Sequence, residues 1–164
     1  MKTFRILLVV AAQACLAAGF AGAAAAQNSF FAILSGAAVC NKPLNADPPL
    51  CRLGDSDAGG TATVMIFGPN HLCAAILVHN LSLTGQTFPV GAHLHIGEAS
   101  YSGPVVVQLG APTANGGGNP GTSMMCNTAV PAATIASIRS NPQFYYIDIH
   151  GGGSQFGALR GQLF

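Results

Sequence analysis

Short apolar segments separated by turns rich in glycine and proline run along most of this chain, and they constrain its fold more than any other feature. The segments are rich in Val, Ile, Phe and Thr, which are enriched in β-strands, and the intervening Gly, Pro and Asn residues favour turns. The expected strands are Ser29–Ser35, Thr61–Phe67, Leu72–His79, His93–Ile96, Val105–Leu109, Phe144–Ile149 and Ala158–Phe164. This pattern predicts a mainly β fold, built as an antiparallel β-sandwich.

One segment, residues 131–141, predicts a single short helix. Pro131 suits the first helical position, and the helix should end before Pro142, because the residue that precedes a proline avoids the α region. Two other segments, 40–60 and 110–121, contain many glycines and prolines and are expected to be loops. Their glycines lack the spacing of a phosphate-binding loop.

The first 26 residues have the pattern of a secretory signal peptide. Lys2 and Arg5 precede a long apolar run, which ends in three alanines just before Gln27. An uncleaved membrane anchor is the alternative, since the run is about long enough to cross a bilayer. No charged residue follows the run to stop its transfer, so cleavage is favoured. We therefore expect a signal peptide at 1–26 and a single domain at 27–164, secreted or periplasmic, with no membrane span after cleavage.

Charged residues make up 7% of the chain, against about 25% in ordinary soluble domains. Loss of Lys2 and Arg5 with the signal peptide would change the formal charge from +1 to −1. No basic cluster is present, and this excludes nucleic acid as a partner.

The expected domain contains four cysteines, Cys40, Cys51, Cys73 and Cys126. An even number in an exported protein predicts two disulfides, for which three connectivities are possible. Because Cys40 and Cys51 flank one loop rich in Pro and Asn, we pair them with each other and pair Cys73 with Cys126. No CxxC pair is present, so the cysteines do not predict a zinc site.

Three histidines form the main candidate site. His93 and His95 are two residues apart, so in a strand both side chains lie on one face. Asp148 and His150 share a face of a later strand by the same rule. If these strands are close, the three imidazoles could bind copper or zinc, with Asp148 orienting one ring. The structural alternative is a cluster of histidines that only form hydrogen bonds. A metal site with bonds near 2 Å requires ring nitrogens within about 4 Å of one another.

Other candidates are weaker. His71 follows a turn and His79 ends a strand, so both are expected to be solvated. Met124 and Met125 beside Cys126 could form a soft Cu(I) site, but a disulfide at Cys126 favours methionines that fill gaps in the core. The acidic run at 55–57 lacks the later ligands of a calcium loop and is interpreted as a turn. No catalytic set is evident: no serine has a nucleophile-elbow motif, and a hydrolase is disfavoured.

The motifs together resemble the CHRD (chordin-type) domain, in a small secreted member of the bacterial type. The resemblance covers nearly all of residues 29–164 and keeps the order of the motifs. Those motifs are Phe31–Ala37, Gly54–Asp57 and Gly60–Val64 at the start, Ala92–His95 and Gly103–Leu109 in the centre, and Ile138–Pro142, Tyr145–His150 and Leu159–Leu163 at the end.

The resemblance implies a Greek-key β-sandwich of the immunoglobulin or superoxide dismutase type. Cysteines at positions like Cys73 and Cys126 occur in bacterial members, which supports that pair. The segment Gly157–Leu159 lacks the acid often found there, and the insert from Cys40 to Cys51 is longer than usual. The family has no single activity. In chordin the domain belongs to an extracellular antagonist of growth factors, but this chain lacks the accompanying cysteine-rich repeats, so that partner is not carried over.

A looser similarity is to copper/zinc superoxide dismutase, in which His93, His95 and His150 would match three copper ligands. No histidine between Glu98 and Tyr145 could bind zinc, so any site would be mononuclear. We therefore expect an exported binding module that holds a copper ion, with a metal ion or an extracellular protein as its partner. A superoxide dismutase-like redox enzyme is one alternative. A non-catalytic structural or adhesive protein is another, and it predicts a flat apolar patch and oligomers.

Overall fold

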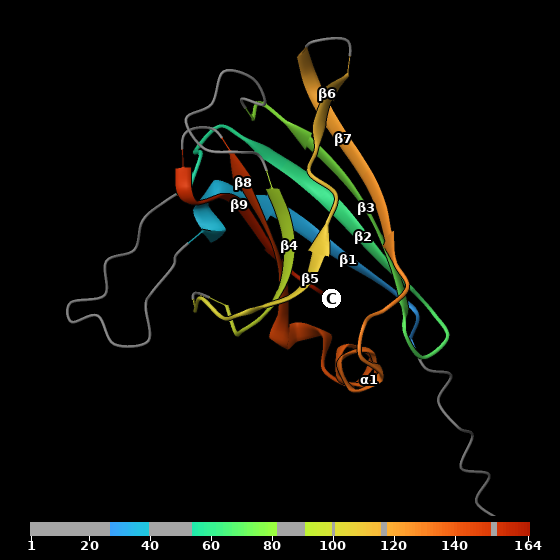
Figure 1. Cartoon of the computed structure of the whole chain (residues 1–164). Coiled ribbons are helices and arrows are strands. Elements are labelled where there is room, and N and C mark those ends of the chain that lie inside the picture. The colour runs from blue at the N-terminus through green and yellow to red at the C-terminus, as the bar shows by residue number, and fades with distance from the viewer. Residues whose placement is uncertain (1–26, 40–53, 82–90, 100, 116–117, 152–153) are drawn as a thin grey trace, which may run out of the picture.

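The computed structural model describes residues 27–39, 54–81, 91–99, 101–115, 118–151 and 154–164. These residues form nine strands, one α-helix and two short 3₁₀ helices (Figure 1). The strands are β1 Ser29–Ser35, β2 Gly59–Phe67, β3 His71–His79, β4 Gly91–Ile96, β5 Val105–Leu109, β6 Thr113–Asn115, β7 Gly118–Asn127, β8 Tyr145–Gly151 and β9 Ser154–Gln162. The helices are α1 Ala132–Ser140 and the 3₁₀ turns Gly36–Ala38 and Pro142–Phe144.

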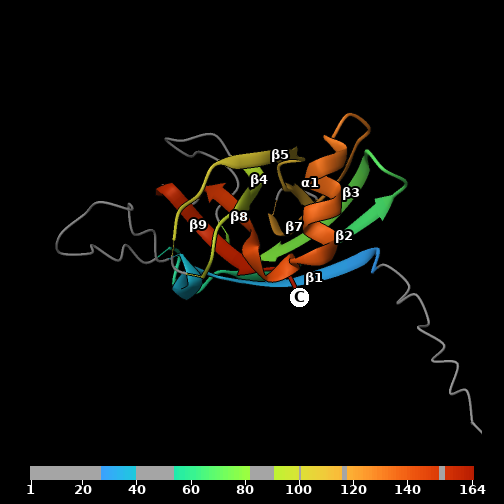
Figure 2. The same ribbon diagram turned by 90° about the horizontal axis from the view of Figure 1, so that it is seen from below.

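All described strands belong to one antiparallel sheet, in the order β5-β4-β8-β9-β1-β2-β3-β7-β6. The sheet curls so far that β5 and β7, from its two ends, are in contact, and the result is a half-barrel (Figures 1 and 2). The predicted mainly β, antiparallel fold with one helix is confirmed. The separate facing sheets of a Greek-key sandwich are not confirmed, because the described strands form one continuous sheet.

The core lies inside this curl. Burial alternates along β1 and β2, as expected for strands with one face on the core. Helix α1 lies across one open end of the half-barrel (Figure 2), where it buries Ile135 and Ile138 against the core. These residues are three positions apart and so lie on one face of the helix. Among the described residues, no helix is long and apolar enough to cross a membrane.

The prediction of a loop over 110–121 is wrong in part. Residues 110–112 lie outside any strand, but Thr113–Asn115 form β6, and β7 begins at Gly118 and pairs with β3 from Leu72 to Val78. Glycine and proline gave no local strand signal there, but β3 offers unpaired backbone groups along its edge. Strand formation at such a place depends on tertiary pairing more than on local propensity. The helix also begins one residue later than expected, with Pro131 as its N-cap.

The disulfide between Cys73 and Cys126 is confirmed. The two residues face each other across β3 and β7, and the bond closes a loop over a sequence separation of 53 residues. Cys40 and Cys51 lie outside the described residues, so their pairing stays a prediction. A turn at residues 68–70 joins β2 to β3.

Candidate metal centre

Strands β4 and β8 bring the three predicted histidines together on the outer face of the sheet. His93 and His95 lie on one face of β4, opposite Asp148 and Tyr146 of β8, and His150 follows on β8. The ring centroid of His93 lies 5.7 Å from that of His95 and 5.1 Å from that of His150. One potential ligand nitrogen from each ring lies within 4.8 Å of the other two. Bonds near 2 Å require ring nitrogens within about 4 Å of one another, so small movements of the rings would be enough to place all three nitrogens around an ion.

Two of these rings have a buried nitrogen with no hydrogen-bond partner among the described residues. His95 Nδ1 lies 2.8 Å from the carbonyl oxygen of Gly103. A carbonyl can only accept, so Nδ1 carries the proton and Nε2 keeps its lone pair. His95 Nε2 and His93 Nδ1 are both buried and unpartnered. A buried polar atom without a partner costs free energy, and a bound cation would satisfy both lone pairs.

The surroundings of the cluster favour neutral imidazoles. Burial lowers the pKa of His93, and the nearby His150 lowers it further, whereas a hydrogen bond with the Gln108 side chain opposes the change. Burial is also the largest cause that lowers the pKa of His95, although the hydrogen bond to Gly103 acts in the opposite direction. Neutral imidazole is the form that binds metal ions, so this electrostatic environment prepares the cluster for a cation.

Asp148 is buried beside the cluster, but it does not hold His150 by a hydrogen bond. Its Oδ2 lies 3.6 Å from His150 Nε2, which is the distance of an ion pair rather than of a hydrogen bond. Burial raises the pKa of Asp148 to about 6, and His150 and Arg160 partly oppose that rise. Among the described residues, the buried Asp148 Oδ1 has no hydrogen-bond partner. Above pH 6 the carboxylate supplies negative charge next to the imidazoles.

Gly157 makes room for this carboxylate. Its φ is +100°, and a methyl group at its Cα would meet the Asp148 carboxylate. Glycine is suited to such a position because it adopts positive φ without steric cost. Strand β9 therefore passes close to the Asp148 side chain at Gly157.

Two buried side chains, Tyr146 and Arg160, form a stack with His95, and the sequence did not reveal this arrangement. The rings of His95 and Tyr146 stack with centroids 4.8 Å apart, and the Arg160 guanidinium lies over the Tyr146 ring, 3.4 Å from its centroid. Arg160 is only 2% exposed. Its burial lowers its pKa, and the same cause raises the pKa of Tyr146. A charged residue is expected at the surface, so only the pairing of β8 with β9, which places Arg160 opposite Asp148, could have shown its role.

The stacked side chains also form hydrogen bonds with the backbone of the segment between β4 and β5. Arg160 donates hydrogen bonds of 2.7 Å and 3.0 Å to the carbonyls of Glu98 and Tyr101, and the Gly103 N–H donates to the Tyr146 hydroxyl. The Gly103 carbonyl also accepts a hydrogen bond from His95, so this one backbone segment contacts all three stacked side chains. The orientation of His95 is therefore determined by a fixed set of buried contacts.

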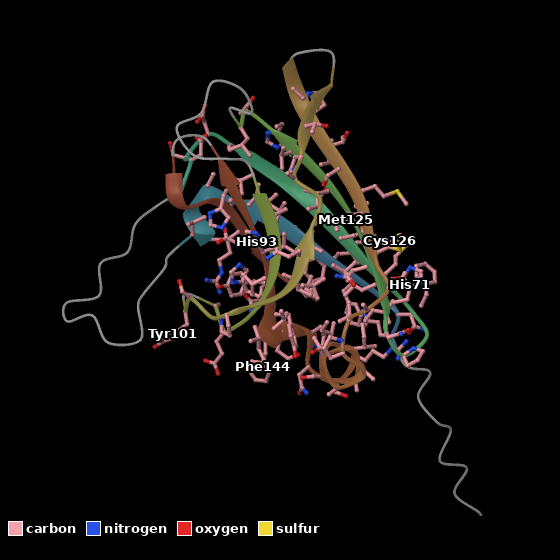
Figure 3. All side chains as sticks on the ribbon, in the orientation of Figure 1. His71, His93, Tyr101, Met125, Cys126 and Phe144 are labelled. Carbon is pink, nitrogen blue, oxygen red and sulfur yellow. A yellow bond between two sulfur atoms is a disulfide. The ribbon has the colours of Figure 1, made fainter. Side chains whose placement is uncertain are left out.

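The remaining candidates lie elsewhere. His71, Cys73 and Cys126 form a second cluster with ligand atoms within 4.8 Å of one another, on a different part of the sheet from His93 (Figure 3). Its two sulfurs are bonded to each other, and a disulfide offers no thiolate to a metal. Met124 is 72% exposed. Met125 is also exposed, so the interpretation of these methionines as core fillers is wrong.

Comparison with protein families gives one match. The model of the CHRD domain family matches residues 30–163, which include all described strands and the helix except for the first residue of β1. Curated proteins and solved structures give no match.

Proposed function

We propose, starting from the fact that this chain belongs to the CHRD domain family, that it is an exported binding module which holds one copper ion. His93, His95 and His150 would be the ligands. The observation that carries the proposal is a pair of buried nitrogens, His93 Nδ1 and His95 Nε2, which have no hydrogen-bond partner among the described residues and lie next to a third imidazole. A cluster that only served structure would be expected to pair such atoms with backbone groups.

The donor set favours copper over other first-row metals. Imidazole nitrogen binds both copper and zinc, but at a given nitrogen site Cu²⁺ binds more tightly. Three histidines leave a coordination position open for water or for a group of a partner. The buried Asp148 carboxylate adds negative charge that offsets the charge of the ion.

Export fits two observations. The disulfide between Cys73 and Cys126 is typical of oxidising compartments outside the cytoplasm. Residues 1–26 have the basic start, apolar run and small-residue end of a signal peptide. We propose that the mature chain begins at Gln27 and is secreted or periplasmic. Intact-mass measurement of the exported protein tests this, and a chain that retains Met1 or is found only in the cytoplasm would contradict it.

Metal titration tests the copper site. The chain from Gln27, freed of metal with EDTA, is titrated with Cu²⁺ and Zn²⁺ in a calorimeter. The expected result is one tightly bound Cu²⁺ per chain, with affinity at least roughly 100-fold lower in His93→Ala and in His95→Ala. His79→Ala is the matched control, because His79 is an exposed strand histidine outside the cluster. Equal affinities in all four proteins, or no binding by any, would contradict the proposal.

A further inference from the structure

One outer face of the half-barrel is apolar and exposed. It belongs to β1, β2, β3 and β7, on the side of these strands that points away from the core. Its large exposed side chains, which we call the apolar face, are Phe31, Ile33, Phe67, Leu77 and Met124, together with Phe164 beside Phe31. Ile33 is 69% exposed and Phe164 is 61% exposed, and each of the others is exposed by 44% or more.

Strand pairing places most of these side chains in two adjacent rows of the sheet. The partners across the strands place Phe31, Thr63, Ala75 and Met124 in one row. The next row contains Ile33, Thr61, Leu77 and Thr122. Phe164 pairs with Phe31 through two backbone hydrogen bonds of 3.0 Å, and the two rings lie 6.4 Å apart. Phe31, Ile33, Leu77, Met124 and Phe164 therefore lie in or beside two adjacent rows of one sheet face, and Phe67 lies at the end of the same face, beyond the row of Met65.

The size of the apolar face matches a protein interface. An aromatic side chain can bury about 150–250 Å². Three phenylalanines that are at least half exposed, with Ile33, Leu77 and Met124, therefore present on the order of 500 Å² of apolar surface. This is at the upper end of what monomeric proteins leave exposed, about 300–600 Å². Each partner contributes roughly 800 Å² to a stable complex, and about 56–65% of that area is apolar, so the apolar face is about as large as the apolar part of such an interface.

The charge of the apolar face indicates which partner fits. Strands β1, β2, β3 and β7 contain no Asp, Glu, Lys or Arg. In a two-fold dimer the same patch meets itself, so any charge would face its own copy. A patch without charges is complementary to itself, and the formal charge of −1 that remains without Lys2 and Arg5 gives little repulsion between copies.

We propose that the apolar face is the interface of a homodimer, in which the faces of two copies pack against each other around a two-fold axis. Side chains of two sheets that face each other interdigitate at about 10 Å, as in the core of a β-sandwich. The histidine cluster lies on β4 and β8, in the other half of the sheet, and stays accessible in such a dimer. The dimer does not depend on copper, and it is the assembly that the structural or adhesive alternative predicts.

Sedimentation velocity of the chain from Gln27 tests the dimer between roughly 1 µM and 100 µM, with EDTA present so that metal binding plays no part. The expected result is a dimer whose dissociation constant rises at least roughly 100-fold in Ile33→Lys and in Leu77→Lys, since each dimer would then bury two charges. Val105→Lys is the matched control, because Val105 is an exposed apolar strand residue in the other half of the sheet. Circular dichroism checks that each variant is folded.

A wild-type chain that stays monomeric throughout this range would overturn the proposal. A dimer that both lysine variants retain would overturn it as well, since the interface would then lie elsewhere. Vesicles of phosphatidylcholine provide a further arm. If the wild-type chain is monomeric but floats with the vesicles, and the lysine variants do not, the apolar face binds lipid and not a second copy.

Discussion

The replacement of Asp148 by asparagine should change stability and copper binding in opposite directions. Asp148 is 5% exposed, and burial raises its pKa from the usual 3.8 to about 6. A raised carboxyl pKa means that the folded chain binds the proton more tightly than the unfolded chain. The stability associated with Asp148 is therefore complete below pH 4 and is lost as the pH rises through about 6. A shift of two units corresponds to about 3 kcal/mol at pH 8.

Asparagine has nearly the same shape as aspartate and cannot ionise. In the metal-free chain, the gain in unfolding free energy of Asp148→Asn over wild type should be about 2 to 3 kcal/mol larger at pH 8 than at pH 4. Urea denaturation at the two pH values measures this difference. Protonation of His93 and His95, whose pKa values are lowered, acts on both proteins alike and largely cancels in the comparison. Asp57→Asn, at an exposed carboxylate, is the control and should give a small difference.

The copper affinity should fall in the same variant, because the cluster loses its nearest negative charge. Loss of a group that supports metal ligands typically costs 10- to 100-fold in affinity, so we expect a decrease of about that size. A variant that is no more stable at pH 8 than at pH 4, relative to wild type, would refute the account of Asp148 as a carboxylate buried at a cost to stability. Unchanged copper affinity would refute its role at the site.

Three further predictions concern residues that support the site or the sheet. Gly157→Ala should lower the free energy of unfolding, measured in urea, by more than about 2 kcal/mol. Gly68→Ala is the control: Gly68 also has a positive φ but has open space around it, so the loss should be only about 1 kcal/mol. Equal losses would show that the Asp148 carboxylate does not pack against Gly157. Replacing Cys73 and Cys126 together by alanine should cost about 4 kcal/mol, because the disulfide closes a loop of 53 residues; an unchanged denaturation midpoint would count against this. Arg160→Lys keeps the positive charge but loses the planar guanidinium that stacks on Tyr146. We expect a loss of about 2 kcal/mol in the free energy of unfolding and roughly 10-fold weaker copper binding. Unchanged stability and unchanged copper affinity would show that the stack is dispensable.

The strand pattern of the sequence predicted most of the fold. Alternation and turn residues placed β1 and β5 with the bounds that the structure shows, and the two-residue spacing placed His93 and His95 on one face of β4. These features depend on neighbours along the chain, which is why the sequence alone was sufficient. Strand β7 depends on the edge of β3 for its pairing, and its glycines and proline concealed it.

The rest of the site depends on which strands become neighbours. The distance from His150 to His93 follows from the pairing of β4 with β8, and the position of Arg160 follows from the pairing of β8 with β9. Neither pairing has a local sequence signal. The burial of Arg160 also runs against the usual tendency of charged residues, and it is possible here because two carbonyls and the Tyr146 ring surround the guanidinium.

Electron paramagnetic resonance of the chain loaded with one equivalent of Cu²⁺ tests the central claim most directly, because nitrogen ligands split the copper signal. The account predicts a spectrum of a single bound Cu²⁺ with three imidazole nitrogens, which changes when His93 and His95 are replaced by alanine and stays the same in His79→Ala. A spectrum of aqueous copper, or one that the His93 and His95 replacements leave unchanged, would contradict the account.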